Sequence, residues 1–589
     1  MEKVNIKIEG HSYQVDAGLT ILEAAKKCGY TIPTLCAFNH GECSRGSCRV
    51  CLVEVKGARG LVASCVYPVN EGMEIIISSP KAVSARRTSV ELLLSNHSKN
   101  CQQCTKNEYC ELLNVAKITG ARDNMYEGSK TTVTIDELTP SIIRDTSKCV
   151  LCGRCVERCK NAQGIGILGF ENRGFRTIVA PAYNRSMKNS PCILCGQCVN
   201  VCPTGALMEK SEIDKLDQAK KEGKYIVVQT APAVRAALGE EFGMPIGTSV
   251  TGKMVAALKR LGFDKVYDTN FAADLTIMEE ATELLHRIKE GGQLPMITSC
   301  SPGWVNYAEY FYGDLLGHLS SCKSPHEMEG AIIKSYFAEK QGLDPKNIFV
   351  VSIMPCTAKK YEKERPENAS KEGLKDVDCV LTTRELARLI KRSGIDFRRL
   401  PDEEFDQDLL GEYTGAGVIF GVTGGVMEAA LRTAYFTVTG KEHELITFKE
   451  VRGFDGLKEA EIDLNGTKIK VAVAHGMKNA KPLLDDIRAG KSPYTFIEIM
   501  GCPGGCINGG GQPFVKPCFL PNEDDNILDT YKEKRAKVLY SEDEKQILRQ
   551  SHRNTQIQQL YKDYLGEPNS HKAHELLHTT YHSRDRYPN

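Results

Sequence analysis

Two cysteine-rich stretches, CVLCGRCVERC (residues 149–159) and CILCGQCVNVCP (residues 192–203), decide the architecture of the first part of this 589-residue chain. Both have the spacing C-x2-C-x2-C-x3-C, and the second ends just before a proline. Four thiolates at this spacing are typical of [4Fe–4S] cluster ligation. Since no other common type of site produces this spacing twice in one chain, the repeat predicts two iron–sulfur clusters.

In paired runs of this kind, the fourth cysteine of each run binds the cluster of the other run. The repeat therefore predicts one cluster on Cys149, Cys152, Cys155 and Cys202, and a second cluster on Cys159, Cys192, Cys195 and Cys198. Clusters in series carry single electrons between a protein surface and a buried centre. We expect the remaining sequence to hold further clusters and that centre.

Composition agrees with a metal-binding protein. The chain has 24 cysteines, and a chain of this size without an export signal uses them for metal ligation more often than for disulfides. Its 76 basic and 75 acidic residues do not indicate a nucleic acid or an anionic membrane as a partner. There is no run of 18 apolar residues, and MEKVNIKIEGHSYQV at the start alternates like a strand. These features predict a cytoplasmic protein.

A four-cysteine motif near the N-terminus has the spacing C-x11-C-x2-C-x13-C, on Cys36, Cys48, Cys51 and Cys65. Its first three members lie in a loop rich in glycine and serine, whose small residues let backbone N–H groups approach sulfide. Four thiolates suit a [2Fe–2S] cluster. A zinc site or free thiols are the alternatives. Cys28 and Cys43 are expected to be structural.

A mixed histidine and cysteine motif follows, with the spacing H-x3-C-x2-C-x5-C, on His97, Cys101, Cys104 and Cys110. Its first two members are four residues apart and could share one helix face. Imidazole and thiolate together bind either zinc or an iron–sulfur cluster, and the spacing alone leaves both open. The neighbouring cluster motifs favour [4Fe–4S].

The sequence pattern divides the chain into five segments. Residues 1–80 alternate short β-like runs with loops, residues 81–140 begin with a helical pattern, and residues 141–209 contain the repeat. In residues 210–530 apolar runs alternate with amphipathic helical stretches, which predicts an α/β domain with a mainly parallel sheet. Residues 531–589 are polar and helical in pattern, and we expect them to wrap the outside.

Three apolar runs of the large domain end at a cysteine. They are QLPMITSC (293–300), NIFVVSIMPC (347–356) and YTFIEIMGC (494–502). Each predicts a buried strand that delivers a thiol at its carboxyl end. In α/β sheets, ligands bind in the crevice beyond this edge. Cysteines far apart in the sequence could therefore converge on one metal site.

Three motifs of this domain resemble the signature loops of the iron-only ([FeFe]) hydrogenases. They are TSCSPGW (298–304), MPCTAKKYE (354–362) and EIMGCPGGCINGGGQP (498–513). The resemblance covers nearly the whole chain, because the preceding cluster motifs match the cluster-rich, clostridial-type members in order and spacing. It implies a β-grasp ferredoxin-like domain, a His/Cys cluster domain, a two-cluster ferredoxin domain and a large α/β domain with the active-site cluster.

The resemblance also implies the active-site group, the H-cluster. In this family four cysteines hold a [4Fe–4S] cube, and one of them bridges to a two-iron unit with CO, cyanide and azadithiolate. Cys356, Cys502 and Cys506 match three of the cube ligands, with Cys506 as the bridge. At the fourth position the family commonly has cysteine, whereas this chain has Ser301. Ser301 could bind through oxygen, Cys300 could be recruited, or the cube could be altered.

A proton path to the buried centre is expected along one helix. Glu280, Glu283 and Arg287 are spaced i, i+3 and i+7, which places them on one stripe. Resemblance to the family adds Cys300 and Ser320 to this relay, with Cys300 passing protons to the azadithiolate amine. On spacing alone, an ordinary solvated face with i,i+4 ion pairs is the alternative.

Further residues around the two-iron unit are assigned by resemblance. Lys359 matches a lysine that donates a charge-assisted hydrogen bond to cyanide, and pairing with Glu362 is compatible with this role. Met354, Met500 and Pro232 match residues that contact the unit. Cys322, in LSSCKSPH, is an additional nearby thiol.

The resemblance predicts an enzyme that interconverts hydrogen with protons and electrons. Its electron partner would be ferredoxin, or flavin-bearing subunits linked to NAD(P), since the sequence has no nucleotide or flavin motif of its own. Maturation proteins would install the two-iron unit. One alternative is a non-catalytic iron–sulfur assembly or sensing protein of the same fold. The first 205 residues also resemble the cluster-bearing large subunit of NADH dehydrogenases, but the three C-terminal motifs do not.

Overall fold

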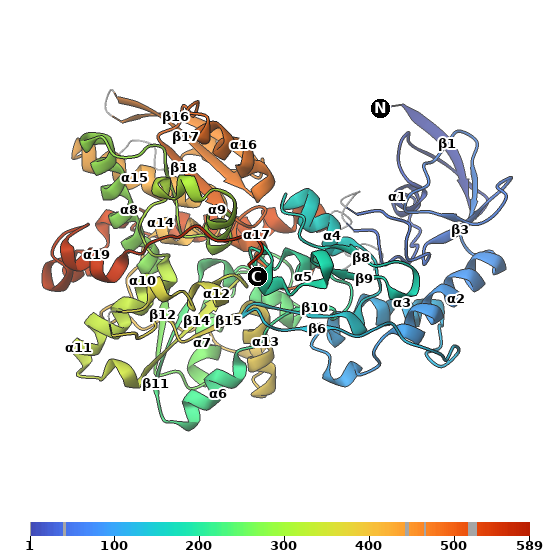
Figure 1. Cartoon of the computed structure of the whole chain (residues 1–589), viewed down its shortest axis with the longest axis horizontal. Helices are drawn as coiled ribbons and strands as arrows, with labels where there is room; N and C mark the ends of the chain where they lie inside the picture. Colours follow the sequence, from blue (N-terminus) through green and yellow to red (C-terminus); the bar gives the residue numbers. More distant parts are fainter. Residues whose placement is uncertain are drawn as a thin grey trace.

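The computed structural model describes residues 2–38, 43–370, 372–441, 447–464, 467–515 and 527–588. A small N-terminal domain lies at one end and a large C-terminal domain at the other, with the cysteine repeat between them (Figure 1). Among the described residues, no helix combines the length and the apolar character that crossing a bilayer requires.

The N-terminal domain is built on a five-stranded sheet, as the alternating sequence pattern predicts. Its strand order is β2-β1-β5-β3-β4, and it is accompanied by helix α1 (Ile21–Lys27). In β1, the inward-facing Ile6 and Ile8 alternate with exposed residues, so one face of the sheet covers a core. The strands are β1 (Lys3–Ile8), β2 (His11–Asp16), β3 (Leu52–Val55), β4 (Val62–Ala63) and β5 (Glu74–Ile76).

Two helices enclose the mixed histidine and cysteine motif. The predicted helix is confirmed as α2 (Pro80–Asn96), which begins where the Ser79 side chain accepts a hydrogen bond from the Ala82 N–H. His97 ends this helix, and α3 (Glu111–Thr119) begins directly after Cys110.

The cysteine repeat folds as a pair of short helices over a small sheet. Helices α4 (Arg154–Glu157) and α5 (Gln197–Val201) each begin at a glycine in the left-handed region, Gly153 (φ 78°) and Gly196 (φ 70°). The sheet has the order β10-β7-β6 and reaches back before residue 141. Its strands are β6 (Ile135–Asp136), β7 (Ile142–Asp145) and β10 (Leu207–Glu209), with a separate hairpin of β8 (Gly169–Glu171) and β9 (Ile178–Ala180).

The large domain contains two four-stranded sheets, whereas the sequence pattern predicted one mainly parallel sheet. The first sheet, β12-β11-β14-β15, is parallel throughout. The second, β13-β18-β17-β16, is parallel except for its last pair. The strands are β11 (Tyr225–Thr230), β12 (Lys265–Asp268), β13 (Met296–Ile297), β14 (Ile348–Met354), β15 (Cys379–Thr382), β16 (Leu457–Leu464), β17 (Thr467–His475) and β18 (Phe496–Met500).

Helices pack around and between these sheets (Figure 1). The longest described one is α8 (Asn270–Glu290), most of whose first four turns are buried. The others are α6 (Ile213–Lys221), α7 (Thr251–Arg260), α9 (Pro302–Phe311), α10 (Pro325–Ile332), α11 (Ala338–Gln341), α12 (Lys359–Glu362), α13 (Thr383–Arg392), α14 (Gly415–Ile419), α15 (Gly425–Thr439) and α16 (Met477–Arg488).

The C-terminal segment is helical as predicted, in α17 (Ile527–Lys545), α18 (Thr555–Leu560) and α19 (His571–Leu577). The expectation that it only wraps the outside is wrong, because Leu560 and Leu577 are fully buried in the core of the large domain. After α19 the chain pairs with residues 321–323, and His578 lies across from Cys322. The mostly polar sequence of this segment did not indicate that it is buried, because scattered apolar residues make its contacts with the core of the large domain.

Candidate active site

A cavity lies where the carboxyl ends of strands from both sheets meet, and with the part that opens to solvent it encloses about 720 Å³. The parallel arrangement of the strands explains why residues distant in sequence converge here. The loops after β11, β12, β13, β14 and β18 all contribute to its wall. The lining side chains include Pro232, Thr269, Cys300, Ser301, His326, Met354, Cys356, Lys359, Phe420, Met500, Cys502 and Cys506.

Three of the predicted cysteines, Cys356, Cys502 and Cys506, face this cavity together. Burial raises the pKa of each thiol above its ordinary value, and the neighbouring thiols raise the pKa of Cys502 and Cys506 further. The Lys359 ammonium opposes this rise at Cys356 and Cys506. Thiols packed this closely ionise together only if a cation compensates their charge, which is how metal binding couples to deprotonation. The donor set therefore fits an iron–sulfur cluster.

Cys300 and Ser301 are adjacent in sequence, but their side chains contact different parts of the active site. The Ser301 hydroxyl accepts a hydrogen bond from the Gly501 N–H at 3.0 Å, directly beside Cys502. Burial raises the pKa of the Cys300 thiol, and Glu280 raises it further. The Cys300 thiol thus lies toward the helix that carries Glu280, whereas Ser301 lies toward the cysteine loop.

Lys359 is held at the cavity wall by a buried ion pair. Its Nζ lies 2.6 Å from Glu362 Oε2 and donates a hydrogen bond to the Cys300 carbonyl at 3.2 Å. Although burial disfavours the charged amine, Glu362 raises the pKa of Lys359, so the side chain stays an ammonium. This compact charge is directed at the cavity.

His326 is a cavity residue that the sequence analysis missed. Its Nε2 lies 2.8 Å from Glu362 Oε2 and its Nδ1 lies 3.1 Å from Ser352 Oγ. It therefore fixes the carboxylate that positions Lys359. The only signal in the sequence was its position directly after Pro325, at the start of α10. Phe420 and Thr269 were missed as well, because nothing in their sequence context distinguishes them from ordinary core residues.

The predicted proton relay lies along α8, and its members are close together at the outer end. Ser320 Oγ donates a hydrogen bond to Glu283 Oε2 at 2.8 Å, and Arg287 binds Glu283 Oε1 at 2.6 Å. The i,i+4 ion pair of the alternative interpretation is thus present. The face is not solvated, however, because the side chains of Glu283 and Arg287 are only 12% and 16% exposed.

Glu280 occupies the inner part of the relay. It is 1% exposed, and among the residues that the structure describes its carboxylate makes only weak hydrogen-bond contacts, with the Ser320 hydroxyl and the Ser299 backbone. Burial and the nearby Glu283 raise its pKa to about 8. A carboxyl group that holds its proton near neutral pH and is only weakly hydrogen-bonded is suited to proton transfer.

The cysteine repeat forms two separate cavities. The first, of about 440 Å³, is lined by Cys149, Cys152, Cys155 and Cys202. The second, of about 350 Å³, is lined by Cys159, Cys192, Cys195 and Cys198. The structure therefore groups the thiols so that each fourth cysteine joins the other run.

The N-terminal motifs differ in how closely they are packed. The Cys36 thiol contacts Cys48 at 3.5 Å and hydrogen-bonds Cys65, which in turn bonds Cys51. Cys43 is buried and Cys28 is half-buried; neither makes a hydrogen bond to these four thiols among the described residues, although Cys36 acts electrostatically on Cys43.

The mixed motif is more open. Burial lowers the pKa of His97 to about 4, so the imidazole is neutral, and its buried Nδ1 has no partner among the described residues. The Cys104 thiol acts electrostatically on Cys110, whereas Cys101 is exposed. A neutral imidazole with an unbonded nitrogen is what a metal ligand requires.

The cavity lined by Cys159, Cys192, Cys195 and Cys198 is adjacent to the active-site cavity. Cys195 lies near both Cys356 and Cys502, where it raises the pKa of Cys502. Two glycines allow this approach, because a Cβ added at Gly196 would lie 2.9 Å from Gly510 Cα and 2.4 Å from Thr357 Oγ1. Thiol sites in series thus lead from the surface to the cavity.

The cysteine-lined cavities lie in series, and the buried carboxylates lead to the same active-site cavity. This arrangement defines the class of protein as an iron–sulfur redox protein. The sequence profile described as "Iron only hydrogenase large subunit, C-terminal domain" matches residues 224–510, and "Iron hydrogenase small subunit" matches residues 529–584. Profiles for a 2Fe–2S cluster binding domain, an NADH-ubiquinone oxidoreductase-G iron–sulfur binding region and a 4Fe–4S dicluster domain match residues 1–80, 86–124 and 148–206.

Individual relatives agree with the profiles. The chain is 48% identical to the NADP-reducing hydrogenase subunit HndD of Solidesulfovibrio fructosivorans over 100% of both chains. It is 44% identical to iron hydrogenase 1 of Clostridium pasteurianum over 98% of this chain and 99% of that protein. The structure superposes on an [FeFe]-hydrogenase of Chlamydomonas reinhardtii with a TM-score of 0.55 and 44% identity, covering 62% of this chain and 98% of that one. The chain belongs to the iron-only hydrogenase family.

A second group of relatives bears on the alternative function. The cytosolic Fe–S cluster assembly factor narfl of Danio rerio is 32% identical over 62% of this chain and 89% of that protein. This similarity is weaker than that to the hydrogenases and covers a smaller part of the chain.

Proposed function

We propose that the chain catalyses the interconversion of hydrogen with protons and electrons at the cavity between the two sheets. The convergence of Cys356, Cys502 and Cys506 on the same cavity as Lys359, with Glu280 buried behind Cys300, is the observation that carries this proposal. An assembly or sensing protein has no need for a relay of buried carboxylates. The hydrogenase function is therefore favoured over that alternative.

The cluster ligands are assigned as the sequence predicts. The N-terminal domain, residues 1–80, would hold one [2Fe–2S] cluster, and residues 81–140 would hold a [4Fe–4S] cluster on His97 and three cysteines. Residues 141–209 would hold two [4Fe–4S] clusters, with the ligand sets that line the two repeat cavities. Residues 210–530 would form the catalytic domain, and residues 531–589 its helical extension.

In the catalytic domain, Cys356, Cys502 and Cys506 would hold the cube, with Cys506 bridging to the two-iron unit. When bound, this H-cluster supplies a metal centre with CO, cyanide and azadithiolate at which hydrogen is formed or split. Lys359 would orient the unit through its charge, and Pro232, Met354 and Met500 would exclude water around it.

Protons would pass between solvent and the cavity along the relay. Arg287 fixes Glu283, and Ser320 connects Glu283 with the interior. Glu280 would then carry the proton to Cys300 by rotation of its carboxyl group, which is held only by weak contacts with Ser320 and Ser299 among the described residues.

Ser301 is assigned to the fourth corner of the cube, and Cys300 to the relay. This assignment is supported by the hydrogen bond from Gly501 N–H to Ser301 Oγ, next to Cys502, and by the proximity of Cys300 to Glu280. Ser301→Cys should increase retention of cube iron under chelator, because thiolate binds iron–sulfur clusters better than a hydroxyl oxygen does. Iron content and electron paramagnetic resonance of the variant measure this. If Cys300→Ala instead loses the cube, the assignment is wrong.

The electron partner is assigned as ferredoxin or a flavin-bearing, NAD(P)-linked subunit in the cytoplasm. Similarity to an NADP-reducing hydrogenase subunit supports a multisubunit partner. Maturation proteins would supply the two-iron unit. Co-purification from the native source identifies the partner, and a flavin-containing subunit in the complex is the expected result.

Infrared spectroscopy of the purified, matured chain tests the proposed function. Bands from iron-bound CO and cyanide, together with hydrogen evolution from a reduced dye, are the expected result. A matured sample that retains its accessory clusters but lacks both the bands and the activity would favour the assembly or sensing function. Cys506→Ala is the control, since it should remove the bands and leave the accessory clusters in place.

A further inference from the structure

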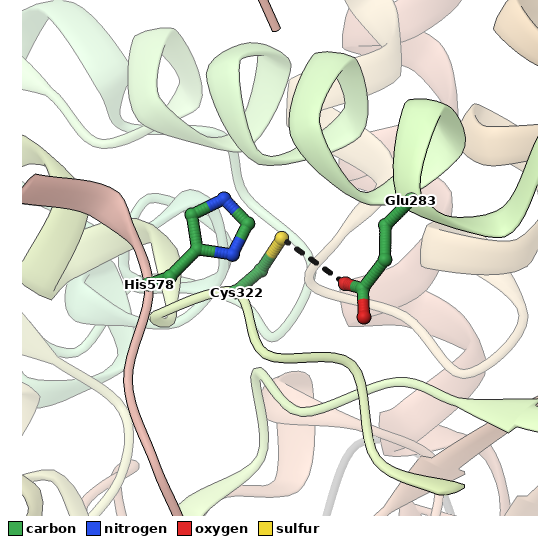
Figure 2. A group of neighbouring side chains, drawn as sticks. All are labelled: Glu283, Cys322 and His578. Atoms are coloured by element: carbon green, nitrogen blue, oxygen red, sulfur yellow. Dashed lines mark hydrogen bonds between the residues drawn. The ribbon is translucent and has the colours of Figure 1, made fainter. Parts of the chain in front are cut away.

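A group of three potential metal ligands lies beside the outer end of the relay. Glu283 extends from α8, Cys322 lies in the loop before α10, and His578 comes from the segment after α19 (Figure 2). One ligand atom from each residue lies within 4.8 Å of the others. Cys322 and His578 are buried, whereas Glu283 remains slightly exposed.

We propose that Glu283, Cys322 and His578 bind a divalent, zinc-like cation that closes the proton relay. The site is distinct from the cluster sites, and it would make hydrogen turnover sensitive to a thiophilic metal ion. The closure of the relay rests on the proton path of the proposed function, whereas the binding of the ion does not.

The chemistry of the three ligands selects zinc among the common cations. Zinc takes thiolate, imidazole and carboxylate ligands at about 2.0–2.3 Å in tetrahedral sites. In such a site the sulfur and the carboxylate oxygen are about 3.6 Å apart, by the tetrahedral geometry of these bonds. The Cys322 Sγ to Glu283 Oε2 distance is 3.8 Å, so this pair needs only a small inward movement, and all three ligand atoms lie within 4.8 Å of one another. Calcium and magnesium prefer oxygen ligands and do not suit this set.

The histidine is held in the tautomer that a metal ligand requires. His578 Nε2 lies 3.0 Å from Glu279 Oε2, while its Nδ1 lies 2.8 Å from Ser321 Oγ. Glu279 also accepts hydrogen bonds from Tyr561 OH and from the Asn569 N–H, so it is an acceptor for the Nε2 proton. The Nδ1 lone pair then accepts the hydrogen bond of the Ser321 hydroxyl, and a cation would take the place of this hydroxyl proton. A ligating histidine with its other nitrogen on a carboxylate is a recurring arrangement in metal sites.

The charges of the site balance those of a divalent cation. One carboxylate and one thiolate bring two negative charges, and the imidazole is neutral. Binding would release the Cys322 thiol proton to solvent, so that the filled site is neutral and can stay in a buried position. Arg287 occupies Glu283 Oε1, and the other oxygen faces Cys322 and Ser320. A water molecule would complete the four ligands.

The proposed metal site includes Glu283 of the proton relay, and a bound cation would therefore inhibit hydrogen turnover. Glu283 would exchange its proton with Ser320 during catalysis, and a cation on the same oxygen would prevent this exchange. The ion would also join the segment matched by the small-subunit profile, which supplies His578, to the large domain. Turnover and the attachment of this segment would therefore respond to the same ion.

Zinc K-edge X-ray absorption of the matured full-length protein, washed with chelator and given one equivalent of zinc, tests the binding. The expected spectrum has one sulfur at about 2.3 Å and nitrogen or oxygen neighbours at about 2.0–2.1 Å. The sulfur contribution should disappear in Cys322→Ala. It should persist in Cys379→Ala, which removes a buried thiol from β15 that lies outside the site. Failure to retain zinc, or a spectrum with several sulfurs, overturns the proposal.

Hydrogen evolution at increasing zinc tests the closure of the relay. Each variant is compared with its own rate in chelator. Wild type and Cys379→Ala should be inhibited in a saturable manner and recover with chelator. Half-inhibition of Cys322→Ala and of His578→Gln should need at least about 10-fold more zinc, because loss of a mere outer-shell partner of a ligand already costs about 10- to 100-fold in metal affinity. If zinc binds through one sulfur and turnover is unaffected, the closure is wrong and the proton path is put in question. The infrared bands would still decide the hydrogenase function separately.

Discussion

Replacing Glu280 by alanine should lower hydrogen turnover by about 10²- to 10⁴-fold, the range that a positioned acid–base group contributes. Glu280 is buried behind Cys300 and stands between it and the outer relay residues. Removing the carboxyl group leaves a gap that no other described titratable side chain of the proposed relay spans. The CO and cyanide bands should remain, because Glu280 is outside the cavity lining.

The dependence on pH separates a proton-transfer role from a packing role. The pKa of Glu280 is raised to about 8 from 4.5, so the folded protein holds a proton that the unfolded chain lacks between these values. The contribution of this residue to stability therefore falls as the pH rises from about 4.5 to 8. Glu280→Gln keeps the shape and should remove this slope, while it should reduce turnover as strongly as alanine does. Turnover near the wild-type value in Glu280→Gln would show that the relay runs elsewhere.

Arg384→Ala should destabilise the junction between the accessory clusters and the catalytic domain by about 3–5 kcal/mol, the cost of breaking a buried ion pair. Arg384 is 2% exposed and donates to Glu209 of β10 at 2.7 Å. It also donates to the carbonyls of Gly510 and Gln512, in the loop that follows Cys506. One side chain thus joins the cluster domain to the active-site loop.

Arg388 provides the matched control, because it pairs with the same Glu209 at 2.8 Å but is 28% exposed. Arg388→Ala should cost less than Arg384→Ala, because the Arg388 side chain is partly exposed and Arg384 still pairs with Glu209 in this variant. Thermal unfolding and limited proteolysis between the domains measure the difference. In Arg384→Ala, hydrogen evolution driven by reduced ferredoxin should fall more than evolution driven by a small dye that reaches the catalytic domain directly. Equal losses in both assays would contradict a role in electron transfer.

Much of the fold was predictable because thiol ligation imposes short, fixed spacings. The repeat of residues 149–159 and 192–203 predicted the grouping of cysteines that line two cavities. The three apolar runs before Cys300, Cys356 and Cys502 predicted strands β13, β14 and β18, which are present. The small N-terminal sheet and helix α2 were predictable from their alternation and helical pattern as well.

Other features were not predictable, because they depend on contacts between segments far apart in the chain. The strands form two sheets, since pairing partners are chosen by packing and leave no local signature. His326 joins the active site only because α10 places it against Glu362, and the C-terminal segment enters the core through a few apolar residues.

The sequence by itself determined the number and order of the cysteine motifs, since most members of each motif lie within a few residues of one another along the chain. The tertiary structure alone decided which groups share the active-site cavity and which carboxylates are buried. Glu280 and Glu283 are three residues apart on one helix, yet only Glu280 is almost fully buried and weakly hydrogen-bonded, whereas Glu283 is firmly bonded to Arg287 and Ser320. The reason is physical: desolvation, which raises the pKa of Glu280, is a property of everything packed around a residue and not of its neighbours in sequence.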